Sequence, residues 1–184
     1  MNVSAGQVAR QVTTIIAIAV AWYGIYLLNE WLFPFFEYTL RANWIFLPAA
    51  FRPLIILMFG GTGAIGLVLG AFLTVYGTSQ TGLLHELAFS AVLGMTPWIA
   101  VASGRALLDL PQNLSGLKAG HVPLLCALCA GMNAITLNSY LWATTGFEGG
   151  SIQIAAVFVG DLVGSTIVLF LMANILAFAM PRRL

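Results

Sequence analysis

Two charged residues, Arg52 and Asp161, stand well inside apolar stretches of the sequence. A charged side chain at the centre of a membrane costs about 2.5–3.5 kcal/mol on insertion scales, so such residues usually face a bundle interior, a cavity or each other. Arg52 lies eight residues into its apolar segment and Asp161 nine residues into another, which predicts a similar depth and an ion pair. Two interpretations are open: a structural pair that fixes helix packing, and a binding or proton-linked site.

Further polar residues fall on the predicted helix faces near these charges. Asn133, Thr136 and Tyr140 recur at the i, i+3, i+7 spacing of one face, and Ser165 follows Asp161 by about one turn. In membrane helices such residues more often bond a neighbouring helix than a ligand, but together they could line a small polar cavity. The ligand or intramembrane polar site that we predict consists of Arg52, Asp161, Asn133, Thr136, Tyr140 and Ser165.

Other reactive residues do not form a recognisable catalytic set. Cys126 and Cys129 have CxxC spacing inside an apolar run, where the spacing merely places two small residues a turn apart, and no second Cys or His cluster accompanies them. His85 and Glu86 begin an apolar segment, where solvation at the membrane surface explains them. Because no Ser/His/Asp set, phosphate loop or metal-spaced His/Cys group is present, we expect neither an enzyme nor a cofactor or metal.

Composition identifies the environment of these residues. Of 184 residues, 60% are hydrophobic and 7% are charged, whereas soluble domains carry about 25% charged residues. So few charges cannot cover a water-exposed surface, and we expect the lipid bilayer to solvate the outside. The net charge of +1 gives no basis for binding nucleic acid. No linker divides residues 1–184, which predicts a single transmembrane domain.

Six apolar segments are candidates to cross the membrane: residues 12–32, 44–59, 62–76, 83–107, 122–144 and 152–180. The second and third reach only about 24 Å each, against a hydrocarbon core of about 30 Å. They therefore form a short helical hairpin that either crosses fully or re-enters from the outer side. The predicted fold is an all-α, six-helix transmembrane bundle. The first segment begins like a signal peptide after Arg10, but its apolar run continues to Leu28, so we interpret it as a retained helix.

The basic residues predict the orientation. One side of the bundle receives Arg10, Arg105, Lys118, Arg182 and Arg183, and the other receives Arg41. Lys and Arg in short loops stay in the cytoplasm, so both termini are expected there. Trp22, Tyr26 and Trp31 gather at the far end of the first segment, as expected of aromatic residues at a membrane–water interface.

Glycines at helical spacing predict close helix packing in two segments: Gly63, Gly66 and Gly70 in the third, and Gly160 and Gly164 in the last. A stripe without side chains lets the backbone approach a neighbouring helix. Leu67 and Leu69, between the glycines of the third segment, are expected to face lipid.

Three stretches, in order along the chain, resemble the membrane-associated sensor domains of bacteria. They are Phe46-Leu47-Pro48-Ala49, the run from Phe59-Gly60 through Gly66 and Gly70, and Val159-Gly160-Asp161-Leu162-Val163-Gly164. Such domains precede histidine kinase or diguanylate cyclase domains, whereas no output domain is expected within residues 1–184, and Arg52 replaces an expected apolar residue. The resemblance implies a stand-alone, sensor-like, multi-pass module of the bacterial inner membrane that works through a membrane protein partner and binds a small-molecule ligand.

Two alternatives are kept open. The vitamin-binding components of energy-coupling-factor transporters are also compact six-helix proteins, and their first helix often carries an Ala-x-x-x-Ala, which Ala17 and Ala21 match. That resemblance implies a substrate-binding component of a transporter. The other alternative is an accessory subunit that binds a larger membrane complex through its glycine-rich faces.

Overall fold

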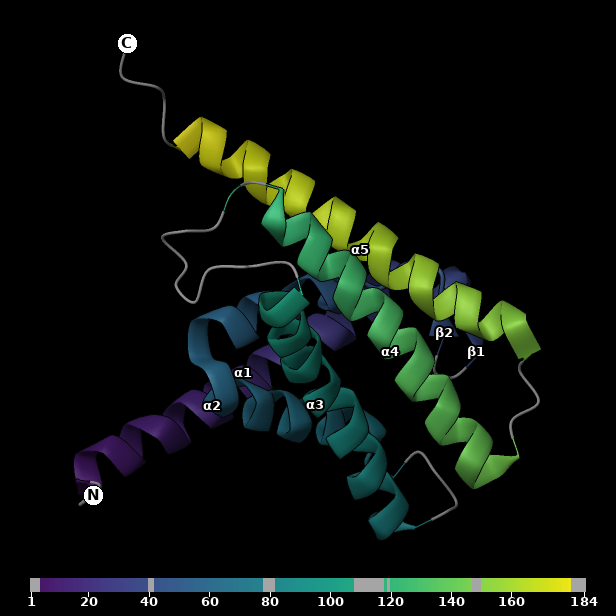
Figure 1. Ribbon diagram of the computed structural model, residues 1–184, viewed down its shortest axis with the longest axis horizontal. Helices are drawn as coiled ribbons and strands as arrows, with labels where there is room; N and C mark the ends of the chain where they lie inside the picture. The colour runs from purple at the N-terminus through teal and green to yellow at the C-terminus, as the bar shows by residue number, and fades with distance from the viewer. Residues whose placement is uncertain are drawn as a thin grey trace.

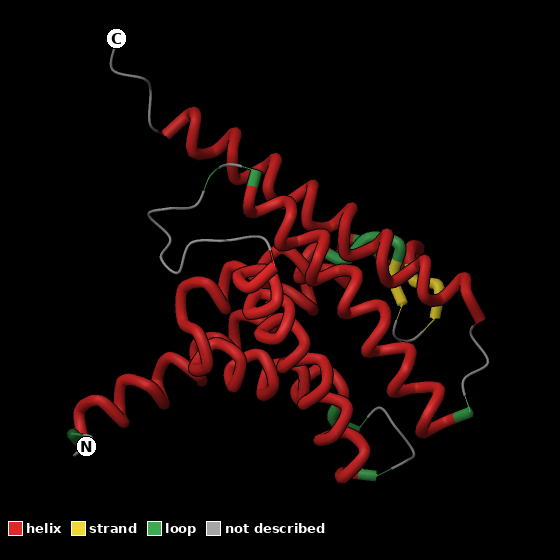
Figure 2. The backbone as a smooth tube through the Cα atoms, in the orientation of Figure 1, coloured by secondary structure: helices red, strands yellow, loops and turns green. Residues whose placement is uncertain are grey.

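The computed structural model describes residues 4–39, 42–77, 82–107, 118, 120–146 and 150–179. Within these residues the chain is mostly helical, with one small β-hairpin and short loops (Figure 2). The five long helices are α1 (Ala5–Leu32), α2 (Phe51–Val75), α3 (Leu83–Leu107), α4 (His121–Thr145) and α5 (Gly150–Ala179). All five are long and apolar enough to cross a membrane, so the described chain is a helical, multi-pass membrane protein. The predicted count of six helices is not confirmed, because two of the predicted segments together form the single element α2.

The difference arises in α2, which is one helical element folded in two at Gly60. Gly60 has φ 55° and ψ −130°, backbone angles that favour glycine. Trp22 of α1 contacts both halves: the guanidinium carbon of Arg52 lies 5.4 Å from the centre of its ring, and a Cβ added to Gly70 would lie 2.8 Å from its side chain. Residues 52 and 70 would be about 27 Å apart in a straight helix, so the chain must reverse between them. The two short segments predicted from the sequence are the two arms of this hairpin.

The hairpin lies along α1 (Figure 1). Its first arm descends antiparallel to α1, because Leu47 bonds to Asn29 and Arg52 lies over Trp22. Its second arm returns parallel to α1, with Gly66 against Ile18 and then Gly70 against Trp22. The tip at Gly60 reaches a hollow beside Trp98, Val101 and Arg105, towards the C-terminal end of α3.

The segment between α1 and α2 covers one end of the bundle. It consists of a 3-10 turn (Pro34–Phe36), strands β1 (Glu37–Thr39) and β2 (Ala42–Asn43), and a second 3-10 turn (Leu47–Ala50). The two strands pair antiparallel and lie against the N-terminal part of α5 (Figure 1). The backbone N–H of Phe46 donates to the carbonyl of Gly160 in α5, at 3.0 Å. This bond fixes the start of the hairpin against the last helix.

Helices α3, α4 and α5 run alternately up and down. Thr96 of α3 bonds Thr136 of α4, and His85, earlier in α3, bonds Tyr140, later in α4. Because the contacts run in opposite order along the two helices, α3 and α4 are antiparallel. The N-terminal end of α1 and the C-terminal end of α5 both lie on the left of Figure 1, opposite the β-strands. The bundle therefore has one end formed by β1, β2 and the start of α3, and an opposite end near the Gly60 tip.

The outer surface is apolar on every long helix. Exposed large hydrophobic residues include Val20, Ile65, Ile99, Ile135 and Phe170, one from each helix. A surface of this kind is stable in lipid, which is as apolar as the side chains themselves. Leu69 is exposed as expected, whereas Leu67 is 2% exposed and belongs to the core, so its predicted lipid-facing position is wrong. Because α2 folds back on itself, its second arm is buried on two sides instead of one, and Leu67 lies on one of the buried sides.

Candidate functional site

Arg52 reaches the interior because two glycines of α5 admit the backbone that precedes it. A Cβ on Gly160 would collide with the carbonyl oxygen of Asn43, and a Cβ on Gly164 would collide with that of Phe46. Since glycine has no side chain, the chain entering α2 can lie directly on α5. The first turn of α2 then carries Arg52 to the level of Asp161.

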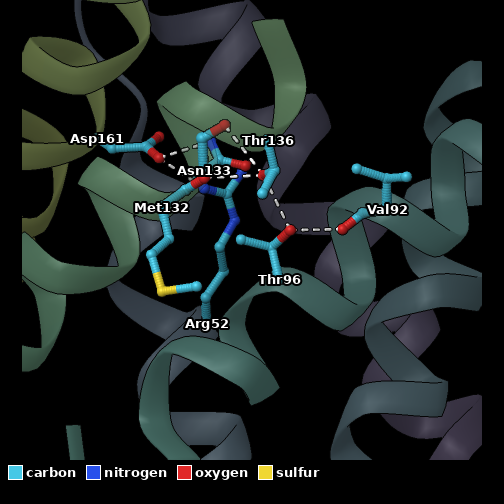
Figure 3. A network of polar contacts seen from close by, with 7 residues as sticks. All are labelled: Arg52, Val92, Thr96, Met132, Asn133, Thr136 and Asp161. Atoms are coloured by element: carbon cyan, nitrogen blue, oxygen red, sulfur yellow. Dashed lines mark hydrogen bonds and ion pairs between the residues drawn. The ribbon is translucent and has the colours of Figure 1, made fainter. Parts of the chain in front are cut away.

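Arg52 and Asp161 form a buried ion pair, as the sequence predicted. Nη1 of Arg52 donates to Oδ2 of Asp161 at 2.6 Å, and their side chains are 7% and 3% exposed. The same oxygen accepts a second hydrogen bond, from Nδ2 of Asn133 in α4, at 2.8 Å. Figure 3 shows the three side chains converging from α2, α4 and α5. The carboxylate is thus compensated by one charged and one neutral donor.

Two aromatic rings contact the other side of the guanidinium. Its carbon lies 5.4 Å from the ring centre of Trp22 and 5.2 Å from that of Phe46, and the two rings meet edge to face at 6.3 Å. A cation over an aromatic face is attracted by about 0.5–2 kcal/mol, and most strongly where water is excluded. Trp22 and Phe46 therefore stabilise the charge of Arg52 together with Asp161.

A cavity of about 260 Å³ lies above this ion pair. The buried polar residues Arg52, Asp161 and Asn133 mark its floor. Glu30, Glu37 and Asn43, which are partly or fully exposed at the β-strand end of the bundle, mark its mouth. Its walls are mostly apolar and come from all five long helices: Trp22, Tyr26, Phe46, Leu67, Ala71, Thr74, Val75, Phe89, Leu93, Gly94, Pro97, Leu137 and Val157. An apolar cavity with a few convergent polar groups is the usual form of a small-molecule site.

The remaining predicted site residues lie beside the floor or away from it. Thr136 bonds Thr96 of α3 at 3.0 Å, which extends the polar cluster from α4 to α3 (Figure 3). Ser165 is buried one turn beyond Asp161, towards Cys126 of α4. Tyr140 lies apart from the cluster, because its hydroxyl meets Nδ1 of His85 at 3.2 Å nearer the β-strand end. The predicted face of α4 thus serves two separate contacts.

Several residues of the cavity were not predicted as site residues. Trp22 and Tyr26 were assigned to the membrane interface, yet Trp22 is 5% exposed and both line the cavity, whereas Trp31 is 76% exposed. The available signal was their spacing, because Trp22, Tyr26 and Glu30 recur every four residues on one helix face. An acidic residue continuing an aromatic stripe marks a face that is not purely lipid-exposed.

Glu86 also differs from expectation. It is 4% exposed rather than solvated at the surface, and its Oε1 accepts a hydrogen bond from the N–H of Gly77 at 3.0 Å. The bond ties the end of the α2 hairpin to the first turn of α3. Glu86 therefore helps to hold the two helices together near the mouth of the cavity.

The cysteines and acidic residues form no metal site in the part of the chain that is described. Cys126 and Cys129 are free and buried in α4, and no three His, Cys, Asp or Glu side chains of the described residues come close enough to hold an ion. The polar groups that line the cavity are one guanidinium, three carboxylates, two amides and the hydroxyls of Tyr26 and Thr74, and the rest of its wall is apolar.

Comparison with known proteins adds no assignment: no protein-family model, no curated protein and no solved structure matches this chain.

Proposed function

We propose that this protein is a sensor-like membrane module that binds a small molecule in the bundle cavity and acts through a membrane protein partner. The observation that supports binding is the cavity of about 260 Å³ above the pair of Arg52 and Asp161. A ligand touching Arg52, Asp161 and Asn133 contacts α2, α5 and α4 at once. Such a ligand would change the relative stability of their arrangements, which is the means by which binding can be transmitted to a partner.

The proposed orientation places the cavity mouth outside the cytoplasm. Arg10, Arg105 and Lys118 lie at helix ends away from the β-strands, whereas Glu30 and Glu37 lie at the β-strand end. The basic side is the cytoplasmic side, so both termini are cytoplasmic and the module belongs in the bacterial inner membrane. In this orientation α2 enters the membrane from the outer face and returns to it.

A second candidate function is the substrate-binding component of a transporter. Ala17 and Ala21 are both exposed on α1, and α1 is the least covered helix, with 17% of its most apolar stretch buried against 39–44% in the others. A small-residue face of this kind suits contact with another membrane helix. The same face would serve the third candidate, an accessory subunit without a ligand of its own.

Native mass spectrometry of the gently extracted protein tests these functions. We expect a small molecule to co-purify, and the variant Ala71→Phe to lose it, because Ala71 lines the cavity and is 3% exposed. Ile65→Phe is the matched control, since Ile65 lies on the same arm of α2 and is 55% exposed. Retention of the molecule by both variants would show that it binds elsewhere. A stoichiometric protein partner with no small molecule would favour the accessory subunit.

A further inference from the structure

The charges that line the cavity are unequal in number. Among the described residues, its lining contains the three carboxylates of Glu30, Glu37 and Asp161 and the single guanidinium of Arg52, so the net charge is −2 when all are ionised. Arg52 is already paired with Asp161 at 2.6 Å. An anionic ligand would therefore meet no unpaired positive charge of the lining, and it would pass two carboxylates on its way in.

The two glutamates lie where a ligand would enter. Glu30 is half-buried near the C-terminal end of α1 and accepts a hydrogen bond from Nδ2 of Asn43 at 3.2 Å. Glu37 begins β1 and is exposed. Because a cleft with apolar walls concentrates the field of the charges at its rim, the pair attracts cations and repels anions over the whole opening.

The floor offers a further acceptor. Asn133 is 3% exposed, and its Nδ2 donates to Asp161, which fixes the orientation of the amide. Its Oδ1 is buried, and no group among the described residues donates to it. A buried carbonyl oxygen without a donor costs free energy, so a donor supplied by a ligand or by water would be stabilised there.

The walls suit a cation with an apolar body. Trp22, Tyr26, Phe46 and Phe89 present aromatic surface to the cavity, and aromatic faces attract ammonium groups. In α3, Pro97 has no N–H, so the carbonyl of Leu93 lacks the hydrogen bond that the helix would otherwise give it. Both residues line the cavity. Acidic residues at the rim, acceptors within and aromatic walls favour the same class of molecule.

We propose that the ligand is a small organic cation, a protonated amine or quaternary ammonium, carried on an apolar or aromatic body. This inference rests on the proposed function, because it assigns a ligand class to the same cavity. The ammonium group lies towards Glu30 and Glu37, and the body occupies the apolar space above Arg52.

Two thiol reagents of similar size and opposite charge test the proposal on the whole chain. Trimethylammonioethyl and sulfonatoethyl methanethiosulfonate differ in charge and react with the same thiolate. They are applied to Thr74→Cys and, as a second cavity position, Leu93→Cys, with Tyr76→Cys as the reference, since Tyr76 is 65% exposed at the same end and does not line the cavity. The unsubstituted chain reports any reaction of Cys126 and Cys129. Because the whole chain is used, the charge of Arg41, which lies outside the described residues, also contributes to the measured rates.

The cation-to-anion rate ratio should be about tenfold or more higher at the two cavity positions than at Tyr76→Cys, the lower end of the range for focused fields. Adding Glu30→Gln, which keeps an oxygen for Asn43, should lower that ratio several-fold. Phenyltrimethylammonium at millimolar concentration should slow the labelling of Thr74→Cys, and benzenesulfonate should not.

The outcomes separate this inference from the function on which it rests. An equal or lower ratio at the cavity positions, or protection by benzenesulfonate alone, would overturn the cation assignment and leave a ligand-binding cavity. A high ratio without protection by phenyltrimethylammonium would also overturn it, because the cavity would then attract small cations without holding an organic one. Failure of both reagents to reach both cavity positions, while Tyr76→Cys reacts, would contradict the proposed function itself.

Discussion

At the scale of single residues, the pair of Arg52 and Asp161 is the most sensitive point of the molecule. Both side chains are almost fully buried and joined at 2.6 Å, and removing one partner of a buried pair typically costs about 3–5 kcal/mol. We expect Arg52→Leu and Asp161→Leu each to destabilise the protein by that amount, because each leaves an uncompensated charge. The double substitution should recover much of the loss. Unfolding in detergent, monitored by tryptophan fluorescence, measures the coupling.

One control variant makes this cycle specific. Thr166→Leu in α5 alters an exposed residue one turn beyond Asp161 whose hydroxyl bonds only within its own helix, so it should change stability little. If the losses at Arg52 and Asp161 simply add in the double variant, the two charges do not stabilise each other. If the double variant folds but no longer retains the co-purifying molecule, the pair serves binding as well as packing.

Asn133 should contribute less to the stability of the folded protein than Asp161 does. It donates one hydrogen bond to the shared carboxylate oxygen, and a hydrogen bond to a charged group contributes about 1.5–3 kcal/mol. Asn133→Leu should therefore destabilise by that smaller amount, measured in the same unfolding assay. A loss as large as that of Asp161→Leu would mean that the amide, and not the guanidinium, is the main partner of the carboxylate.

At the scale of elements, glycines decide which segments can touch. A Cβ on Gly70 would lie 2.8 Å from Trp22, whereas one on Gly61 would meet nothing within 4 Å. We expect Gly70→Ala to separate the hairpin from α1 and to lower the yield of folded, extractable protein. Gly61→Ala, in the same element, should be neutral or slightly stabilising, because alanine favours helix over glycine by about 1 kcal/mol. Size-exclusion chromatography after detergent extraction compares the two; equal yields would contradict a packing role for Gly70.

The helical segments were largely predictable, and their folding was not. Hydropathy located every long helix, because the length of an apolar run is a local property. Most predicted ends lie within two residues of the observed ones, but the starts of α1 and α2 were each misplaced by seven residues. The Gly60-Gly61 break was visible as well. The sequence does not show that Gly66 and Arg52, which belong to opposite arms of the hairpin, contact neighbouring turns of α1. Two short helices joined by a turn and one helix folded at a glycine have the same local pattern of apolar residues and glycines, so hydropathy does not distinguish them.

The site was predictable to a similar degree. Arg52, Asp161 and Asn133 could be found because a charge inside an apolar run needs a partner, and because residue counts gave their depth. Trp22 and Phe46 could not be found in the same way, since aromatic residues are common in membrane helices and their burial depends on how α1 meets the hairpin. Leu67 was misplaced for the same reason: only the second arm's contacts on two sides explain its burial.

At the scale of the whole molecule, the proposed orientation is directly testable. Ser4 and Lys118 are exposed at one side of the bundle, and Phe35 is 95% exposed at the β-strand end. In intact cells, an impermeant thiol reagent should label Phe35→Cys and leave Ser4→Cys and Lys118→Cys unlabelled. A permeant reagent should label all three, which controls for their reactivity. Labelling of Lys118→Cys from outside would reverse the orientation. Positions such as Ser115 and Gly149 lie outside the described residues.

The ion pair joins two parts of the chain that are 109 residues apart, and this separation imposes an order on biosynthesis. The ribosome releases Arg52 long before Asp161, so the arginine enters the membrane without its carboxylate. Trp22 and Phe46 precede it and are already present to receive the guanidinium. The cavity floor is completed only when α5, the last of the five helices, is inserted. A nascent chain that stops before Asp161 therefore leaves Arg52 in the membrane without its carboxylate partner.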